Sequence, residues 1–195
     1  MSLDLAHLDP DTRRYMLAEL QADVATGTLY RSPQLTEGGV RLYDRLLLDA
    51  LQNGTETSLA EALCVCSAVR PPSRWQHPRE VGQEEALVDA TTRLAEREFH
   101  RFYIRGLCLR ALDQGVESLV IYRARPADPG RAPSDAMIGV RIAASSLLED
   151  LRGMFRSFPP HGLPPCRDPG LSVRLPDDLQ WQGATAPLAA RSGTR

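Results

Sequence analysis

The stretch LAEREFHRFYIRGLCLRALDQG, residues 94–115, is the most regular part of the chain, and its pattern governs the interpretation of the rest. Apolar residues recur every three or four positions, the spacing of one helix face: Ile104, Leu107, Cys108, Ala111 and Leu112. We expect one long helix from Glu84 to Asp113, closed by Gly115 as C-cap. Gly106, in its middle, predicts close approach of another backbone or a large side chain, and the following strand is the expected neighbour.

Arginines recur at every fourth position of this helix: Arg93, Arg97, Arg101 and Arg105. On a helix, residues four positions apart form a row that shifts slowly around the axis. We expect this row, the arginine ladder, on the outer surface. Glu96 and Glu98 relieve part of the repulsion between the like charges. Two interpretations stay open: a binding site for a polyanion or an acidic partner, and a solvated face laced with weak ion pairs.

The composition is that of an ordinary globular protein. The chain has 195 residues, 43% hydrophobic and 25% charged, and its formal net charge of -2 gives no overall field that attracts nucleic acid or an anionic membrane. All 23 basic residues are arginine, which excludes the lysine-containing phosphate loop and lysine Schiff-base chemistry. We see neither a secretory signal nor an apolar run of about 18 residues, so we expect a cytoplasmic protein without a membrane partner.

The rest of the chain predicts an α+β fold, in which an N-terminal helical unit and a small β-sheet accompany the long amphipathic helix. The expected division is a helical unit over 1–66, an exposed linker over 67–83, the long helix with the sheet over 84–158, and a proline-rich extended tail with one short strand over 159–195.

Capping residues and alternation place the shorter elements within these units. Helices are expected over 10–26, 37–53 and 58–66, and the last is opened by a capping box of Ser58 and Glu61. A second capping box, Ser146 with Glu149, opens a short helix over 146–155. Strands are expected in VESLVIYRAR (116–125), AMIGVRI (136–142) and LSVRLP (171–176).

Candidate catalytic residues are few. His100 and Glu96 lie four positions apart on the long helix, so an imidazole and a carboxylate could form the oriented pair used in general base catalysis. No other member of an active site can be named, so the sequence favours a protein that is not an enzyme. The sequence also disfavours a metal-dependent nuclease, because such a site requires acids on a strand together with a lysine, and the chain has no lysine. The acids considered for it are Asp128, Asp135, Glu149 and Asp150.

The four cysteines are too few and too unevenly spaced for a disulfide scaffold, and we expect free thiols. A zinc site could be assembled on paper from Cys64, Cys66, His77, His161 and Cys166. It is disfavoured because two thiols two positions apart on a helix point about 200° apart around its axis. We expect no metal and no cofactor.

Four segments resemble a group of short, uncharacterised bacterial proteins associated with phage and prophage genomes: EFHRFYIRGLCLRAL (98–112), VIYRA (120–124), GLSVRLP (170–176) and GTLYRSPQLTEGGVRLYDRLL (27–47). Together they cover under half of the chain, and the group supplies no activity or catalytic residues to carry over. The resemblance ends at CVCSAVRPPSRWQHP (64–78) and after Pro176. It implies a virion or assembly component.

We therefore expect a structural or binding protein that acts through protein–protein contacts or self-assembly, in the cytoplasm or in a phage-like particle. In one form of this hypothesis, LSVRLP adds a strand to the sheet edge of a partner. One alternative is an enzyme acting on nucleic acid or a nucleotide through His100, Glu96 and Arg101. Another is a non-enzymatic nucleic-acid binder that uses the arginine ladder.

Overall fold

A computed structural model describes residues 3–70, 83–126, 136–153 and 170–177 of the chain. Helices and strands within these ranges confirm the α+β class, with one long helix packed on a small antiparallel sheet. In chain order the elements are α1 (Pro10–Thr26), α2 (Glu37–Asn53), α3 (Glu56–Val65), α4 (Gln83–Asp113), β1 (Ser118–Arg123), β2 (Arg141–Ala143), α5 (Ala144–Gly153) and β3 (Leu171–Arg174).

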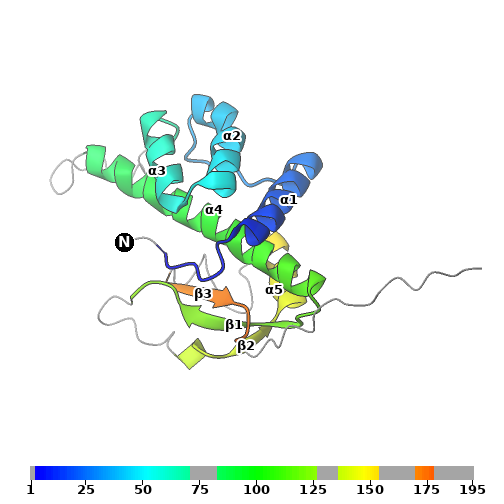
Figure 1. Ribbon diagram of the computed structural model, residues 1–195. Helices are drawn as coiled ribbons and strands as arrows, with labels where there is room; N and C mark the ends of the chain where they lie inside the picture. Colours follow the sequence, from blue (N-terminus) through cyan, green and yellow to red (C-terminus); the bar gives the residue numbers. More distant parts are fainter. Residues whose placement is uncertain (1–2, 71–82, 127–135, 154–169, 178–195) are drawn as a thin grey trace, which may run out of the picture.

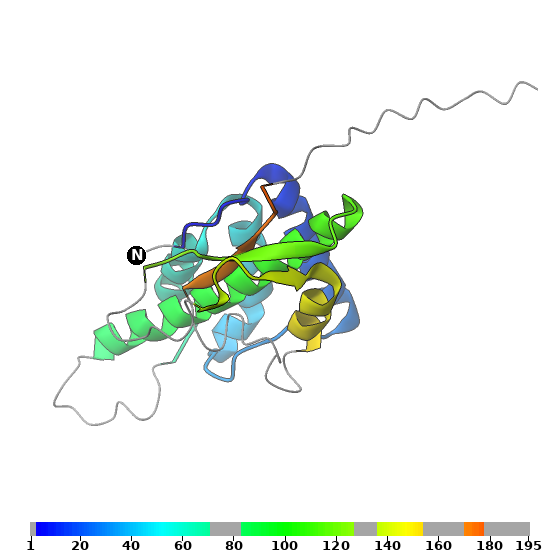
Figure 2. The ribbon, with the colours of Figure 1, turned by 90° about the horizontal axis from the view of Figure 1, so that it is seen from below.

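Helix α4 is the centre of the molecule. Figure 1 shows α1, α2 and α3 on one side of α4 and the strands on the other, and Figure 2 shows the sheet lying across α4 from below. α4 contacts α1, α2, α3, α5, β1 and β3. Residues 98–108 are all buried, which is about three helical turns. The predicted long helix is confirmed, but over these turns it has no solvent-facing flank.

The sheet is antiparallel with the order β2-β1-β3. Leu119 of β1 lies opposite Ile142 of β2, and Ile121 lies opposite Val173 of β3. All four of these side chains are buried, and they join one core cluster that extends from α1 to β3. β3 pairs with β1 of its own chain through one edge of LSVRLP; within the described residues its other edge has no strand neighbour, so pairing with a partner's sheet stays a prediction.

Gly106 allows α1 to approach α4 closely. A Cβ atom on Gly106 would lie 2.6 Å from Cγ and 2.8 Å from the backbone N of Met16. Real Cβ atoms do not come this near to other heavy atoms, so alanine would not fit without a shift of α1. The close approach is confirmed, but the neighbour is a helix and not the expected strand.

Two helices begin earlier than the sequence indicated. Thr55 is the N-cap of α3: its Oγ1 accepts the Ser58 N–H at 3.2 Å, and Ser58 Oγ accepts the Thr55 N–H at 2.9 Å. The capping box is therefore Thr55 with Ser58, not Ser58 with Glu61. α5 follows β2 directly at Ala144, so Ser146 lies inside its first turn and is not the N-cap.

The expected linker is part of the core where it begins. Ala68 and Val69 are buried, and Val69 forms an isolated β-bridge with Leu35. Residues 71–82 of the linker, and most of the expected tail, lie outside the described residues. None of the described helices has an apolar stretch long enough to cross a membrane.

Candidate functional site

Arg105 of α4 is enclosed by two carboxylates of α1. Its Nε donates to Glu19 Oε2 at 2.7 Å, while its Nη1 and Nη2 donate to the two oxygens of Asp23 at 2.6 and 2.8 Å. Arg152 of α5 forms a second ion pair with Glu19. Two positive and two negative side chains thus form a charge-balanced cluster that ties α1, α4 and α5 together.

This cluster determines which face of α1 is buried. Glu19 and Asp23 are buried, whereas the apolar Val24 is 46% exposed. Burial by itself raises the pKa of Glu19, but the hydrogen bond from Arg152 and the charge of Arg105 outweigh it, so that the pKa lies below its ordinary value. Glu19 therefore stays ionised, which keeps the pairing with arginine intact.

A second ion cluster, centred on the buried Glu98, lies about two helical turns earlier on α4. Glu98 is inaccessible to solvent and pairs with Arg97 at 3.2 Å and with Arg101 at 2.8 Å. The guanidinium of Arg101 lies 4.7 Å from the centre of the Phe102 ring, and that of Arg105 lies 5.0 Å from it. Arg101 and Arg105 thus contact the Phe102 ring as well as carboxylates, all within the protein interior.

The expectation of an outward-facing arginine ladder is wrong for half of its members. Arg101 and Arg105 are 0% and 1% exposed. The side chain of Arg93 is 72% exposed and that of Arg97 is 37% exposed, and both pair with carboxylates of α4. The physical reason is that α4 is surrounded on all sides in this stretch, so a spacing that drifts around the helix must carry arginines into the interior.

His100 and Glu96, the candidate catalytic pair, bind different partners. Nε2 of His100 forms a hydrogen bond of 2.9 Å with Oγ of Ser172 on β3. Glu96 instead holds Arg125 through two hydrogen bonds of 2.7 and 3.3 Å. Burial, with a smaller contribution from the charge of Arg125, lowers the pKa of His100 from 6.5 to about 3. The imidazole is therefore a neutral core group that joins α4 to β3.

The cysteines and acids considered for a metal are not brought together in the described part of the chain. No group of three or more histidine, cysteine or acidic side chains is arranged there to hold a metal ion. Cys64 and Cys66 lie at the end of α3, and Glu149 and Asp150 lie on α5. The remaining candidates, His77, Asp128, Asp135, His161 and Cys166, lie outside the described residues.

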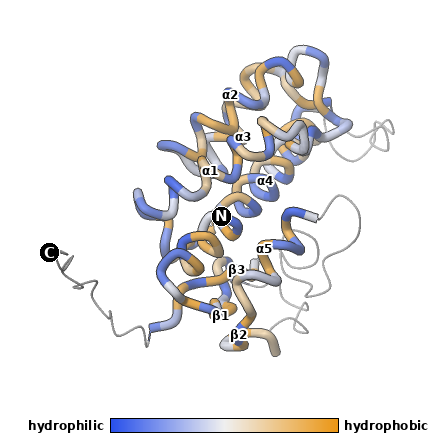
Figure 3. The backbone as a smooth tube through the Cα atoms, turned by 90° about the vertical axis from the view of Figure 1, so that its right-hand side faces the viewer, coloured by the Kyte–Doolittle hydropathy of each residue, from blue (hydrophilic) through white to orange (hydrophobic). Residues whose placement is uncertain are grey.

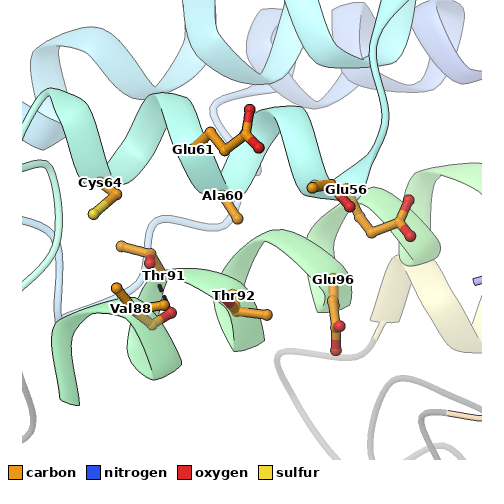
Figure 4. A pocket seen from close by; sticks show the side chains of 9 residues that line it. Glu56, Ala60, Glu61, Cys64, Val88, Thr91, Thr92 and Glu96 are labelled. Carbon is orange, nitrogen blue, oxygen red and sulfur yellow. Dashed lines mark hydrogen bonds between the residues drawn. The ribbon is translucent and has the colours of Figure 1, made fainter. Parts of the chain in front are cut away.

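A pocket of about 310 Å³ lies between α3 and α4. Figure 4 shows Glu56 and Glu96 at one end of it and Cys64 and Val88 at the other, so the two helices run antiparallel along its length. Glu96, the candidate general base, lines it, as does Cys64, which was considered for a zinc site. Glu56 could not be singled out from the sequence, because an acid in the first turn of a helix is ordinary.

Comparison of the chain with protein-family models, with curated proteins and with solved structures found no match.

Proposed function

We propose that this protein is a structural or binding protein that assembles with copies of itself through protein–protein contacts at the β2 edge of its sheet. The observation that carries the proposal is exposed apolar surface beside an edge strand. Ile138 and Val140, which lead into β2, are 43% and 48% exposed. In the described part of the chain, β2 has a strand neighbour on one side only. Such an edge is a ready template for another strand.

Hydrogen bonding to β1 continues just beyond β2, up to a turn over residues 136–139 in which Gly139 has a φ of 83°, so the expected strand over 136–142 is strand only from Arg141. The Ile121 N–H donates to Val140 O at 3.0 Å, and the Gly139 N–H donates to Ile121 O at 2.8 Å. A two-fold antiparallel pair centred on Ile142 would place Arg141 of one copy opposite Ala143 of the other. Like charges are then not opposed, and Val140 adds apolar contact.

Sedimentation velocity of the full chain over a range of concentrations tests this proposal. We expect a concentration-dependent oligomer that is weakened by the double substitution Ile138→Asp and Val140→Asp. The matched control is Val24→Asp with Val40→Asp, two helical positions of similar exposure (46% and 43%) away from β2. A chain that stays monomeric throughout, or equal weakening by both pairs of substitutions, would contradict assembly at this edge.

A test of whether the C-terminal tail contributes to assembly requires a deletion that leaves the sheet intact. Truncation after Pro169 would remove β3 and with it the Ser172 hydroxyl that binds His100. Deletion of residues 178–195 leaves β3 in place, and we expect it to weaken assembly without loss of the fold, as circular dichroism would report. The context of a phage-like particle rests on the resemblance of the four sequence segments.

The alternative of an enzyme or binder of nucleic acid stays a prediction with less support. A polyanion in solvent would meet Arg93 and Arg97, since Arg101 and Arg105 are buried in ion pairs. If nucleic acid binds through this helix, affinity should fall steeply with salt, and Arg93→Gln with Arg97→Gln should reduce that salt slope. Binding that is unaffected by this double substitution would exclude the helix as the site.

A further inference from the structure

Four acidic residues are buried in the described part of the chain: Glu19, Asp23, Glu56 and Glu98. Three of them are paired with arginine, as described above. Glu56 differs, because it is 3% exposed and forms no ion pair with the described residues. Its one hydrogen bond there comes from the Leu3 N–H, 2.8 Å from Oε1, and Oε2 accepts none from the described residues. A buried carboxylate without a cation is costly unless something neutralises it.

The same residue lines the pocket between α3 and α4. The described residues of the pocket wall include no arginine or histidine, and the charge of Glu96 is already balanced by Arg125. Ala60 and Val88 supply apolar surface, and Thr57 and Thr92 supply hydroxyls. At about 310 Å³, the volume is at the lower end of pockets that hold small molecules. Of the three acids in the lining, Glu56 and the exposed Glu61 form no ion pair with a described residue, and Figure 4 shows Glu56 at one end of the space.

We propose that this pocket binds an organic cation, an alkylammonium or alkylguanidinium group with a short apolar stem. The cationic end pairs with Oε2 of Glu56, and the stem lies along Ala60 toward Val88. A guanidinium or ammonium group supplies the charged donor that the other three buried acids receive from arginines of the chain. The cation can come from a small amine or from the side chain of a partner protein, because both present the same chemistry.

A purely structural role for Glu56 makes different predictions. As the first residue of α3, its negative charge is favoured by the helix dipole, and Oε1 fixes Leu3. Glu56→Gln keeps an oxygen that can accept from Leu3 but removes the charge. If the charge serves a ligand, the variant should fold as well as the parent and lose binding. Glu117→Gln is the matched control, since Glu117 is exposed and far along the chain from the pocket.

Isothermal titration of the full chain with two probes tests the site and separates its sources. Agmatine represents a free amine, and a capped Gly-Arg-Gly peptide represents a protein side chain; the same peptide with neutral citrulline is the uncharged control. We expect at least one cationic probe to bind, with affinity at least about tenfold weaker in Glu56→Gln and unchanged in Glu117→Gln. Preference for agmatine would assign a small ligand, and preference for the peptide would assign a partner.

Three results would overturn the proposal: no binding of either cationic probe at millimolar concentration, equal binding of the citrulline peptide, or equal affinity in Glu56→Gln. If Glu56→Gln does not fold, as judged by circular dichroism, Ala60→Met provides a second test. Its longer side chain occupies part of the pocket beside Glu56 and leaves the carboxylate in place, so binding should be weakened; binding unchanged in Ala60→Met would place the cation elsewhere. Because the pocket is separate from the β2 edge, this test and the assembly test can fail independently.

Discussion

The guanidinium of Arg105 and the carboxylate of Asp23 form a two-pronged ion pair inside the protein, with both N–O distances between 2.6 and 2.8 Å. This pair joins the middle of α4 to the end of α1, at positions 82 apart in the sequence. Arg105, expected from the sequence to be available to an external anion, thus pairs with a carboxylate of its own chain. Figure 3 shows the same feature more broadly, with hydrophilic residues interspersed along α4 in the middle of the molecule.

Gly106→Ala should destabilise the protein although alanine is the better helix former. Alanine gains about 1 kcal/mol in helix propensity, but the new methyl group meets the backbone N and Cα of Met16, which cannot move without shifting α1. We expect a net loss of about 1–3 kcal/mol in the free energy of unfolding, measured by urea denaturation. Gly38→Ala, in the first turn of α2 with nothing nearer than 3.9 Å, is the control and should be neutral or stabilising.

The free energy of unfolding should decrease as the pH is lowered below about 6.5, because of His100. Its pKa is about 3 in the folded protein and 6.5 in the unfolded chain, so between these values the unfolded state binds a proton that the folded state does not. The contribution is complete above pH 6.5 and decreases by about 1.4 kcal/mol for each pH unit below it.

Replacement of His100 by glutamine, which can still bond to Ser172, should flatten this part of the stability curve. Denaturant unfolding at a series of pH values between 4 and 7 measures the slope. Glu19, whose pKa is lowered in the fold, loses its contribution only below its ordinary value of 4.5, so between pH 5 and 6.5 the slope contains the His100 contribution and not that of Glu19. Identical slopes for parent and variant between pH 5 and 6.5 would show that His100 does not titrate as described.

The thiols should differ widely in reactivity. Burial raises the pKa of Cys108 to about 12, with a smaller effect from the charge of Glu19, so the thiolate is absent at neutral pH. Cys66 is exposed and should react with a thiol reagent much faster than Cys108. Mass spectrometry after brief labelling should therefore find Cys66 modified and Cys108 protected until the protein unfolds. Fast labelling of Cys108 in the native protein would mean that the interior around α4 opens readily.

The sequence predicted α4 well because a long segment with regular spacing is a strong signal, and Asp113 is its end in both prediction and structure. It could not show what surrounds each face, because the carboxylates that receive Arg105 lie 86 and 82 positions away. A signal did exist in α1, where Glu19 and Asp23 alternate with the buried Met16 and Leu20. Acidic residues on the apolar face of a helix indicate that a basic side chain from another element packs against that face.

The short elements were less predictable for a local reason. Ser58 can serve either as an N-cap or as the third residue of a helix, and Thr55 three positions earlier is an equally good cap. The pocket residue Glu56 had no distinguishing pattern, since its significance comes from the absence of an arginine partner in the described fold. Such pairing is a property of tertiary structure.

Comparison of Arg105→Met with Arg93→Met in denaturant unfolding tests whether the arginines of α4 act inside the protein or on its surface. The substitution of Arg105 leaves Asp23 buried without its cation, so we expect a loss of about 3–5 kcal/mol, partly restored when Asp23→Leu is added. Arg93, with a side chain 72% exposed, should contribute within about 0.5 kcal/mol. Equal and small losses for the two substitutions would contradict the internal role of the α4 arginines.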